Sequence, residues 1–80
     1  MFKNKNNSFN NLCGTNVKKY RLLQSPHMSQ RGLADKLQLE GIDLDKNAIQ
    51  RIESGQRFVT DIELVALSRV LNISLQELVD

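Results

Sequence analysis

The chain has 80 residues, of which 40% are apolar and 25% are charged, and its formal net charge is +2 at pH 7. This length suffices for one hydrophobic core, and the ordinary composition excludes wholesale disorder and a fibrous repeat. No apolar run approaches the roughly 18 residues that cross a bilayer, and no signal-peptide pattern opens the chain, so we expect a cytoplasmic protein. One cysteine and one histidine exclude an internal disulfide and a zinc site, so we expect no metal and no cofactor.

Charge is distributed unevenly along the chain, and the net value conceals this. Residues 1–34 contain six Lys and Arg and no acidic residue, whereas residues 60–80 contain one Arg and four Asp and Glu. The basic segment favours a polyanionic partner, although lysines on a solvated tail would give the same pattern. Within this segment, the candidates for phosphate contacts are Lys18, Lys19 and Arg21.

The first eleven residues, MFKNKNNSFNN, are rich in asparagine and lysine. Two scattered phenylalanines bury too little surface to offset the entropy of ordering, so we expect residues 1–11 to form a flexible arm and residues 12–80 to form the domain. A basic arm could wrap around DNA, and it could equally be a plain tail.

Helical spacing of apolar residues begins after this arm. Cys13, Val17, Tyr20 and Leu23 recur at intervals of three and four, which predicts that they share the buried stripe of a first helix ending near residue 23 or 24. Cys13 is expected to act as a small buried hydrophobe and not as a reactive thiol. Pro26 then prevents the helix from continuing.

Four further helices are predicted from capping residues, each preceded by an apolar residue that can pack against the one five positions later. The predicted caps are Ser29, Asp45, Thr60 and Ser74. The last two caps are completed as capping boxes by Glu63 and Glu77, and Gly55 is expected to end the third helix. No segment alternates over strand length, so the sequence predicts an all-α fold of five short helices around one core.

The predicted helix after Asp45 has an apolar face and a polar face. At about 100° per residue, Ala48, Ile49 and Ile52 fall on one side and the polar residues fall within an arc of roughly 140° on the other. Arg and Lys pair with the acceptors of guanine, and Asn and Gln pair with adenine, so this array suits the base edges of DNA. A solvated amphipathic face is the alternative, but such a face usually carries acids and this arc has none. The polar residues are Lys46, Asn47, Gln50, Arg51 and Ser54.

Several motifs follow one another in order between residues 13 and 79. They are Ser29-Gln30 with Leu33-Ala34, then Ile49-x-Arg51-Ile52-Glu53-x-Gly55-x-Arg57, then Leu64 to Leu71 with Ile73-Ser74-Leu75-x-Glu77-Leu78. This series resembles the lambda-repressor/Cro-like helix-turn-helix family, often called the XRE family. The resemblance implies a compact five-helix DNA-binding domain whose second and third helices form the helix-turn-helix. It also implies a homodimer that binds two half-sites about 34 Å apart on double-stranded DNA.

The resemblance makes the third helix the recognition helix. Lys46, Asn47 and Arg51 match its base-reading positions, and Gln50 is a further candidate.

Other positions match residues that hold such a domain on the DNA backbone. Ser29 and Gln30 lie at the amino end of the second helix, where unpaired amides suit a phosphate, and Gln30 also matches a brace for the recognition helix. Arg21 and Glu53 match an ion pair that ties the first helix to the third, although Arg21 could contact phosphate as well. The remaining phosphate candidates, from the loop after the recognition helix and from the basic first helix, are Gln56, Arg57, Lys18 and Lys19.

Two connections are longer than the family pattern. Fourteen residues, 35–48, separate Ala34 from Ile49, so the helix-turn-helix has an enlarged turn. Either the second helix continues by a turn through Leu39, or the linker itself is enlarged. The first connection, residues 24–28, is also longer.

These observations predict a sequence-specific transcriptional regulator, acting as a repressor through a recognition helix in the major groove. The alternative is an antitoxin, or another protein-binding module of the same fold, whose partner would be a toxin. Leu75, Leu78 and Val79 could form that interface or complete the core. We expect no enzyme, because the chain has no P-loop, metal cluster or nucleophile–base pair. We expect no membrane partner, because the basic residues share no face with an exposed apolar stripe.

Overall fold

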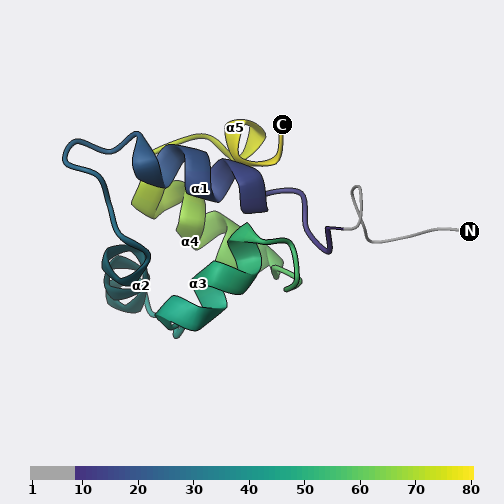
Figure 1. Ribbon diagram of the computed structural model, residues 1–80, viewed down its shortest axis with the longest axis horizontal. Coiled ribbons are helices and arrows are strands. Elements are labelled where there is room, and N and C mark those ends of the chain that lie inside the picture. The colour runs from purple at the N-terminus through teal and green to yellow at the C-terminus, as the bar shows by residue number, and fades with distance from the viewer. Residues whose placement is uncertain (1–8) are drawn as a thin grey trace, which may run out of the picture.

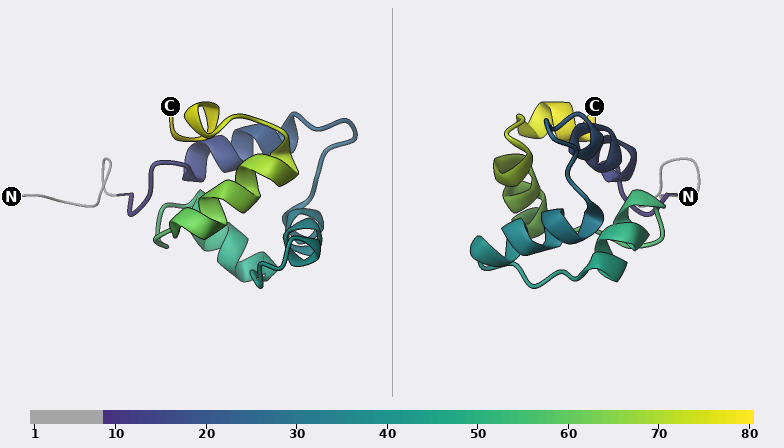
Figure 2. Two further views of the ribbon diagram at one scale, coloured as in Figure 1. Left: turned by 180° about the vertical axis from the view of Figure 1, so that it is seen from behind. Right: turned by 60° about the vertical axis from the view of Figure 1, so that its left-hand side comes forward.

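The computed structural model describes residues 9–80, and residues 1–8 lie outside the described part of the chain. In this part the chain forms five helices and no strand, which confirms the all-α prediction. Helices α1, α4 and α5 pack together at one end, and α2 and α3 pack against each other at the opposite end (Figures 1 and 2). The helices are α1 (Gly14–Leu22), α2 (Gln30–Leu39), α3 (Lys46–Glu53), α4 (Asp61–Leu71) and α5 (Leu75–Val79).

All five helices contribute to one hydrophobic core. Along α2, α3 and α4 its fully buried members are spaced by three or four residues, which is the spacing of a single helical face, and α1 and α5 contribute one such residue each. Each such side chain stabilises the fold by about 1.5–3 kcal/mol when it leaves water. The largest of these side chains are Val17, Leu33, Leu37, Ile49, Ile52, Leu67, Leu71 and Leu78.

The first helix differs from the prediction at its end. It stops at Leu22, and Leu23 is 66% exposed, so the prediction that Leu23 completes the buried stripe was wrong. Arg21 is buried instead, because it follows Val17 by one full turn and finds a carboxylate partner inside. The prediction for Cys13 is confirmed: it is 1% exposed, and burial raises the pKa of its thiol to about 11.

The predicted helix starts are confirmed by their caps. The side chains of Ser29 and Asp45 accept hydrogen bonds from the third amide of α2 and α3, at 2.9 Å and 2.8 Å. Thr60 and Ser74 form complete capping boxes with the glutamates three residues later. Gly55, with φ at 84°, ends α3 in the left-handed conformation that favours glycine.

The long connection before α3 is shared between helix and turn. Helix α2 continues through Leu39, which is 88% exposed, and residues 40–45 form the turn. Leu44 is buried and Ile42 packs against the core. The alternative in which the second helix continues through Leu39 is therefore correct. Leu44 and Ile42 anchor the enlarged turn that leads into α3.

Candidate nucleic-acid interface

Helix α3 divides its side chains between core and solvent as the sequence predicted. Ile49 and Ile52 are fully buried, and Ala48 is buried beside them. Along residues 9–80, no ion pair engages Lys46 or Arg51, so their donors remain open to a partner. The exposed residues of the opposite face are Lys46, Asn47, Gln50, Arg51 and Ser54.

A buried ion pair holds α3 against α1. Arg21 Nε lies 2.7 Å from Glu53 Oε2, and Arg21 Nη2 donates to Glu53 Oε1 at 3.0 Å. The two side chains are only 8% and 4% exposed. The pair expected from the resemblance is therefore present, and loss of either partner would leave a buried charge uncompensated.

Gln30 connects the amino end of α2 to the same carboxylate. Its Nε2 donates to Glu53 Oε1 at 3.0 Å, so Glu53 accepts three hydrogen bonds from two elements. Arg21 Nη1 also donates to the carbonyl of Met28, just before α2, at 2.9 Å. The first amides of a helix lack intrahelical partners and point outward. The arrangement thus keeps these amides of α2 in a constant position relative to the exposed face of α3.

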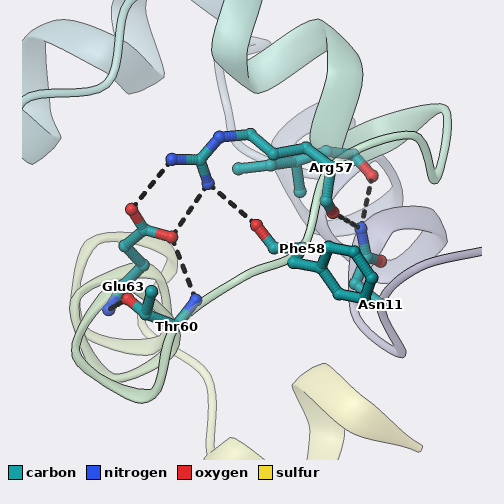
Figure 3. A network of polar contacts seen from close by, with 6 residues as sticks. Asn11, Arg57, Phe58, Thr60 and Glu63 are labelled. Atoms are coloured by element: carbon teal, nitrogen blue, oxygen red, sulfur yellow. Dashed lines mark hydrogen bonds and ion pairs between the residues drawn. The ribbon is translucent and has the colours of Figure 1, made fainter. Parts of the chain in front are cut away.

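The loop between α3 and α4 is held by Arg57, and its partner is one that the sequence did not indicate (Figure 3). The guanidinium donates twice to Glu63, at 2.9 Å and 3.1 Å, and once to the Phe58 carbonyl at 3.0 Å. Glu63 also accepts from the Thr60 amide at 3.0 Å, so one carboxylate serves both the capping box and the ion pair. The hydrogen bonds from Arg57 hold the pKa of the Glu63 carboxyl below its ordinary value.

This ion pair bears on the expected role of Arg57 at a phosphate. A guanidinium has five N–H donors, and the three hydrogen bonds to Glu63 and Phe58 occupy three of them. Two donors are therefore not engaged by these hydrogen bonds. The hydrogen bonds to Glu63 raise the pKa of Arg57 above its ordinary value, so the guanidinium keeps its positive charge.

Residues 9–11, which the sequence assigned to a flexible arm, are instead held against the carboxyl end of α3. The Asn10 amide donates to the Gly55 carbonyl at 2.7 Å, and Asn10 Nδ2 donates to the Gln56 carbonyl at 3.0 Å. The ring of Phe9 covers Gly55 so closely that a Cβ at position 55 would overlap it. The rest of the expected arm, residues 1–8, lies outside the described residues.

Asn11 makes the most extensive of these contacts, and Figure 3 shows its amide beside the α3–α4 loop. Its Nδ2 donates to the carbonyls of Ile52 and Arg57, at 3.1 Å and 2.7 Å, and its Oδ1 accepts from the Gly14 amide at 2.7 Å. One side chain therefore joins the end of α3, the following loop and the start of α1. The asparagine three residues before the first helix was the available signal, and the asparagine-rich surroundings obscured it.

The remaining phosphate candidates occupy two separate places. Gln56 is exposed and follows the last residue of α3 by three positions. Its backbone N–H donates to the Arg51 carbonyl at 2.9 Å, so the structure brings Gln56 next to the α3 array. Lys18 and Lys19 are exposed on α1, and Lys19 Nζ lies 5.1 Å from the centroid of the Tyr20 ring. These lysines belong to a different helix from the array.

The fold and the exposed α3 face together define a helix-turn-helix DNA-binding domain. A family model described as helix-turn-helix matches residues 17–78. The chain belongs to the lambda-repressor/Cro-like, or XRE, helix-turn-helix family, whose members are transcriptional regulators that bind double-stranded DNA. Comparisons with curated proteins and with solved structures gave no match.

Two further properties concern residues 9–80 alone. None of the helices in this range combines the length and the apolar character needed to cross a bilayer. The His, Cys, Asp and Glu side chains in this range form no group of three that could hold a metal ion.

Proposed function

We propose that the protein is a cytoplasmic, sequence-specific repressor that places α3 in the major groove of double-stranded DNA. The exposed, acid-free face of α3 is the observation that carries this proposal. Lys46 and Arg51 supply donors for the paired acceptors of guanine, and Asn47 and Gln50 supply the donor and acceptor that adenine requires. Occupancy of a promoter excludes other proteins from it, so repression needs no further surface on this small domain.

The amino end of α2 and the loop after α3 are proposed to hold the two sides of the groove. Ser29 caps the first of these elements, so its hydroxyl is engaged while the neighbouring amides face a phosphate. Gln30 is proposed to contact the same phosphate while it braces Glu53. The loop contributes Gln56 and the free donors of Arg57. On α1, the proposed phosphate contacts are Lys18 and Lys19.

We propose that two copies bind together, one on each half of a palindromic site. Family membership supports this arrangement, in which the two recognition helices enter successive major grooves about 34 Å apart. The two-fold symmetry of the protein pair would then appear as symmetry in the operator.

Selection of binding sites from random duplexes, at two salt concentrations, tests the proposal. The expected result is a palindromic consensus whose affinity falls steeply with salt, by a logarithmic slope of about 0.9 for each phosphate neutralised. No enriched sequence would overturn specific recognition. An enriched sequence without palindromic symmetry would overturn the dimer while leaving the α3 assignment in place.

The alternative function is an antitoxin with a toxin as partner. Of the three apolar residues that motivated it, Leu78 is fully buried and completes the core, Val79 is partly buried, and Leu75 is exposed on α5. The exposed leucine and the acidic last third favour a protein contact on this side. Purification from the native source tests this alternative. A second protein that co-purifies in stoichiometric amount with the wild type and is absent from the purified L75D variant would support it. Recovery of the wild-type chain alone would overturn it.

A further inference from the structure

Helix α4 presents apolar side chains to solvent beside a shallow groove. Ile62 is 68% exposed and Val65 is 36% exposed, and both line a groove of about 340 Å³. Glu40 and Ile42, from the enlarged turn before α3, also line this groove. Exposed isoleucine and valine at adjacent turns of one helix are the kind of surface that another helix covers.

The exposed residues of α4 that line this groove, from Asp61 to Arg69, form a strip along the helix. Opposite charges lie at equal distances on either side of its centre. Asp61 lies four residues before Val65 and Arg69 lies four residues after it, and both line the same groove. At about 1.5 Å and 100° per residue, each charge lies about 6 Å along the helix from Val65 and about 40° to either side of it. The strip is therefore self-complementary in charge. When a second copy of the strip runs in the opposite direction, its Arg69 lies at the end where the first copy has Asp61.

We propose that this strip is the contact between two copies of the chain, with a two-fold axis at Val65 and with their α4 helices antiparallel and crossing at about 50°, so that the row Asp61, Val65, Arg69 of one copy lies along the same row of the other. Asp61 of one copy is then level with Arg69 of the other, and the symmetry makes this pair twice. Ile62 of each copy packs beside Val65 of the other and leaves water. A different protein would need a matching charge pattern of its own, whereas a second copy of this chain has that pattern by symmetry.

Arg69 is able to make this contact. Its nearest partner within the chain is Glu40, with Arg69 Nη1 at 3.8 Å from Glu40 Oε1, and the Arg69 side chain is 69% exposed. A single helix pair buries less than the roughly 1,600 Å² of a standard interface. We therefore expect a dimer that is weak in solution and that forms efficiently once adjacent half-sites bring two copies together. The inference rests on the proposed homodimer and assigns its surface.

A charge exchange tests the interface in solution, with the full chain and without DNA. Sedimentation equilibrium over a range of concentrations is measured for the wild type, Asp61→Arg, Arg69→Glu and the double variant. Each single variant places like charges together twice, so we expect association to weaken about fivefold or more, and the double variant to return close to the wild type. Asp43→Arg makes the same charge change outside the groove and is expected to associate normally. A melting curve for each variant confirms that it is folded.

Three outcomes would overturn the interface: single variants that associate like the wild type, a double variant that stays as weak as the single variants, or a wild type that remains monomeric at millimolar concentration. Ile62→Asp provides a second test, because an unpaired carboxylate in the apolar strip abolishes association without disturbing the core.

DNA binding separates this inference from the proposed function. Arg69→Glu is expected to lose cooperative binding to a palindromic site and to keep its affinity for a single half-site. Arg51→Ala is expected to lose half-site affinity and to keep self-association. Failure of all DNA binding would overturn the proposed function, and the charge exchange would still decide the interface.

Discussion

The outward face of α3 and the carboxyl end of the same helix use similar polar groups in different ways. On the outward face, asparagine, glutamine, lysine and arginine point into solvent. At the carboxyl end, Glu53 and Asn11 are engaged by hydrogen bonds within the chain. The difference indicates that side chains at the end of α3 hold the helix in place, while those on its face are left for a partner. Substitutions at the two regions should therefore have separable effects on stability and on DNA binding.

The largest effect is expected at Glu53. Glu53→Ala removes the carboxylate that accepts from Arg21 and Gln30 and leaves the buried guanidinium without a counter-charge. We expect the free energy of unfolding, measured by urea denaturation, to fall by about 3–5 kcal/mol. A loss below 1 kcal/mol would show that the ion pair does not hold α3. The comparison variant, Gln50→Ala on the outward face, is expected to stay within about 0.5 kcal/mol of the wild type.

Two asparagines provide the sharpest matched comparison. Asn11→Ala removes hydrogen bonds to the ends of α3 and α1 and is expected to destabilise the fold by about 1–3 kcal/mol, because two carbonyls and an amide lose their partner. Asn47→Ala removes the same side chain from the outward face and is expected to leave the melting temperature unchanged. DNA binding should show the opposite order. At a temperature where both variants are folded, Asn47→Ala should bind the selected site more weakly than Asn11→Ala does. Equal stability of the two variants would contradict the distinction between the regions.

The two arginines after the start of α3 test specificity against general affinity. Arg51→Ala is expected to cost about 1–3 kcal/mol on the selected site and to relax base preference at one position. Arg57→Ala is expected to weaken binding to all sequences by similar amounts and to reduce the salt slope. Binding to the selected site and to an unrelated duplex, each at two salt concentrations, gives both readouts. Uniform weakening by Arg51→Ala would remove it from the base-reading group.

The smallest effect concerns pH and Glu63. The pKa of this carboxyl is lowered by Arg57 in the folded protein, so its contribution to stability is fully present above the ordinary carboxyl pKa and is lost as the pH falls through the lowered value. The pair is partly exposed, with side chains 30% and 14% accessible, so we expect less than about 1 kcal/mol. Denaturation between neutral and acidic pH should show that Glu63→Gln flattens this part of the stability curve. An unchanged curve would mean that other carboxylates account for acid sensitivity.

The local features of this protein could be predicted because each depends on residues close together in the chain. The caps at Ser29, Asp45, Thr60 and Ser74 act within one helical turn, and the predicted hydrogen bonds are present. The division of α3 into a buried and an exposed face also follows from spacing within one helix. The same reasoning did not detect contacts between distant residues, such as those of Asn11 with carbonyls 41 and 46 positions away.

The amino-acid sequence by itself determined five helices, the starts of the last four, the exposed α3 array and the family, because helical periodicity and capping are local properties of the chain. Only the tertiary structure decided that Arg21 is buried and Leu23 is exposed, whereas the ion pair of Arg21 with Glu53, 32 positions away, was already implied by the family resemblance. It also decided that residues 9–11 belong to the domain and that Glu63 binds Arg57 as well as capping α4. Hydrogen bonds of this kind depend on how the helices pack, and packing brings together groups whose separation in the sequence carries no signal.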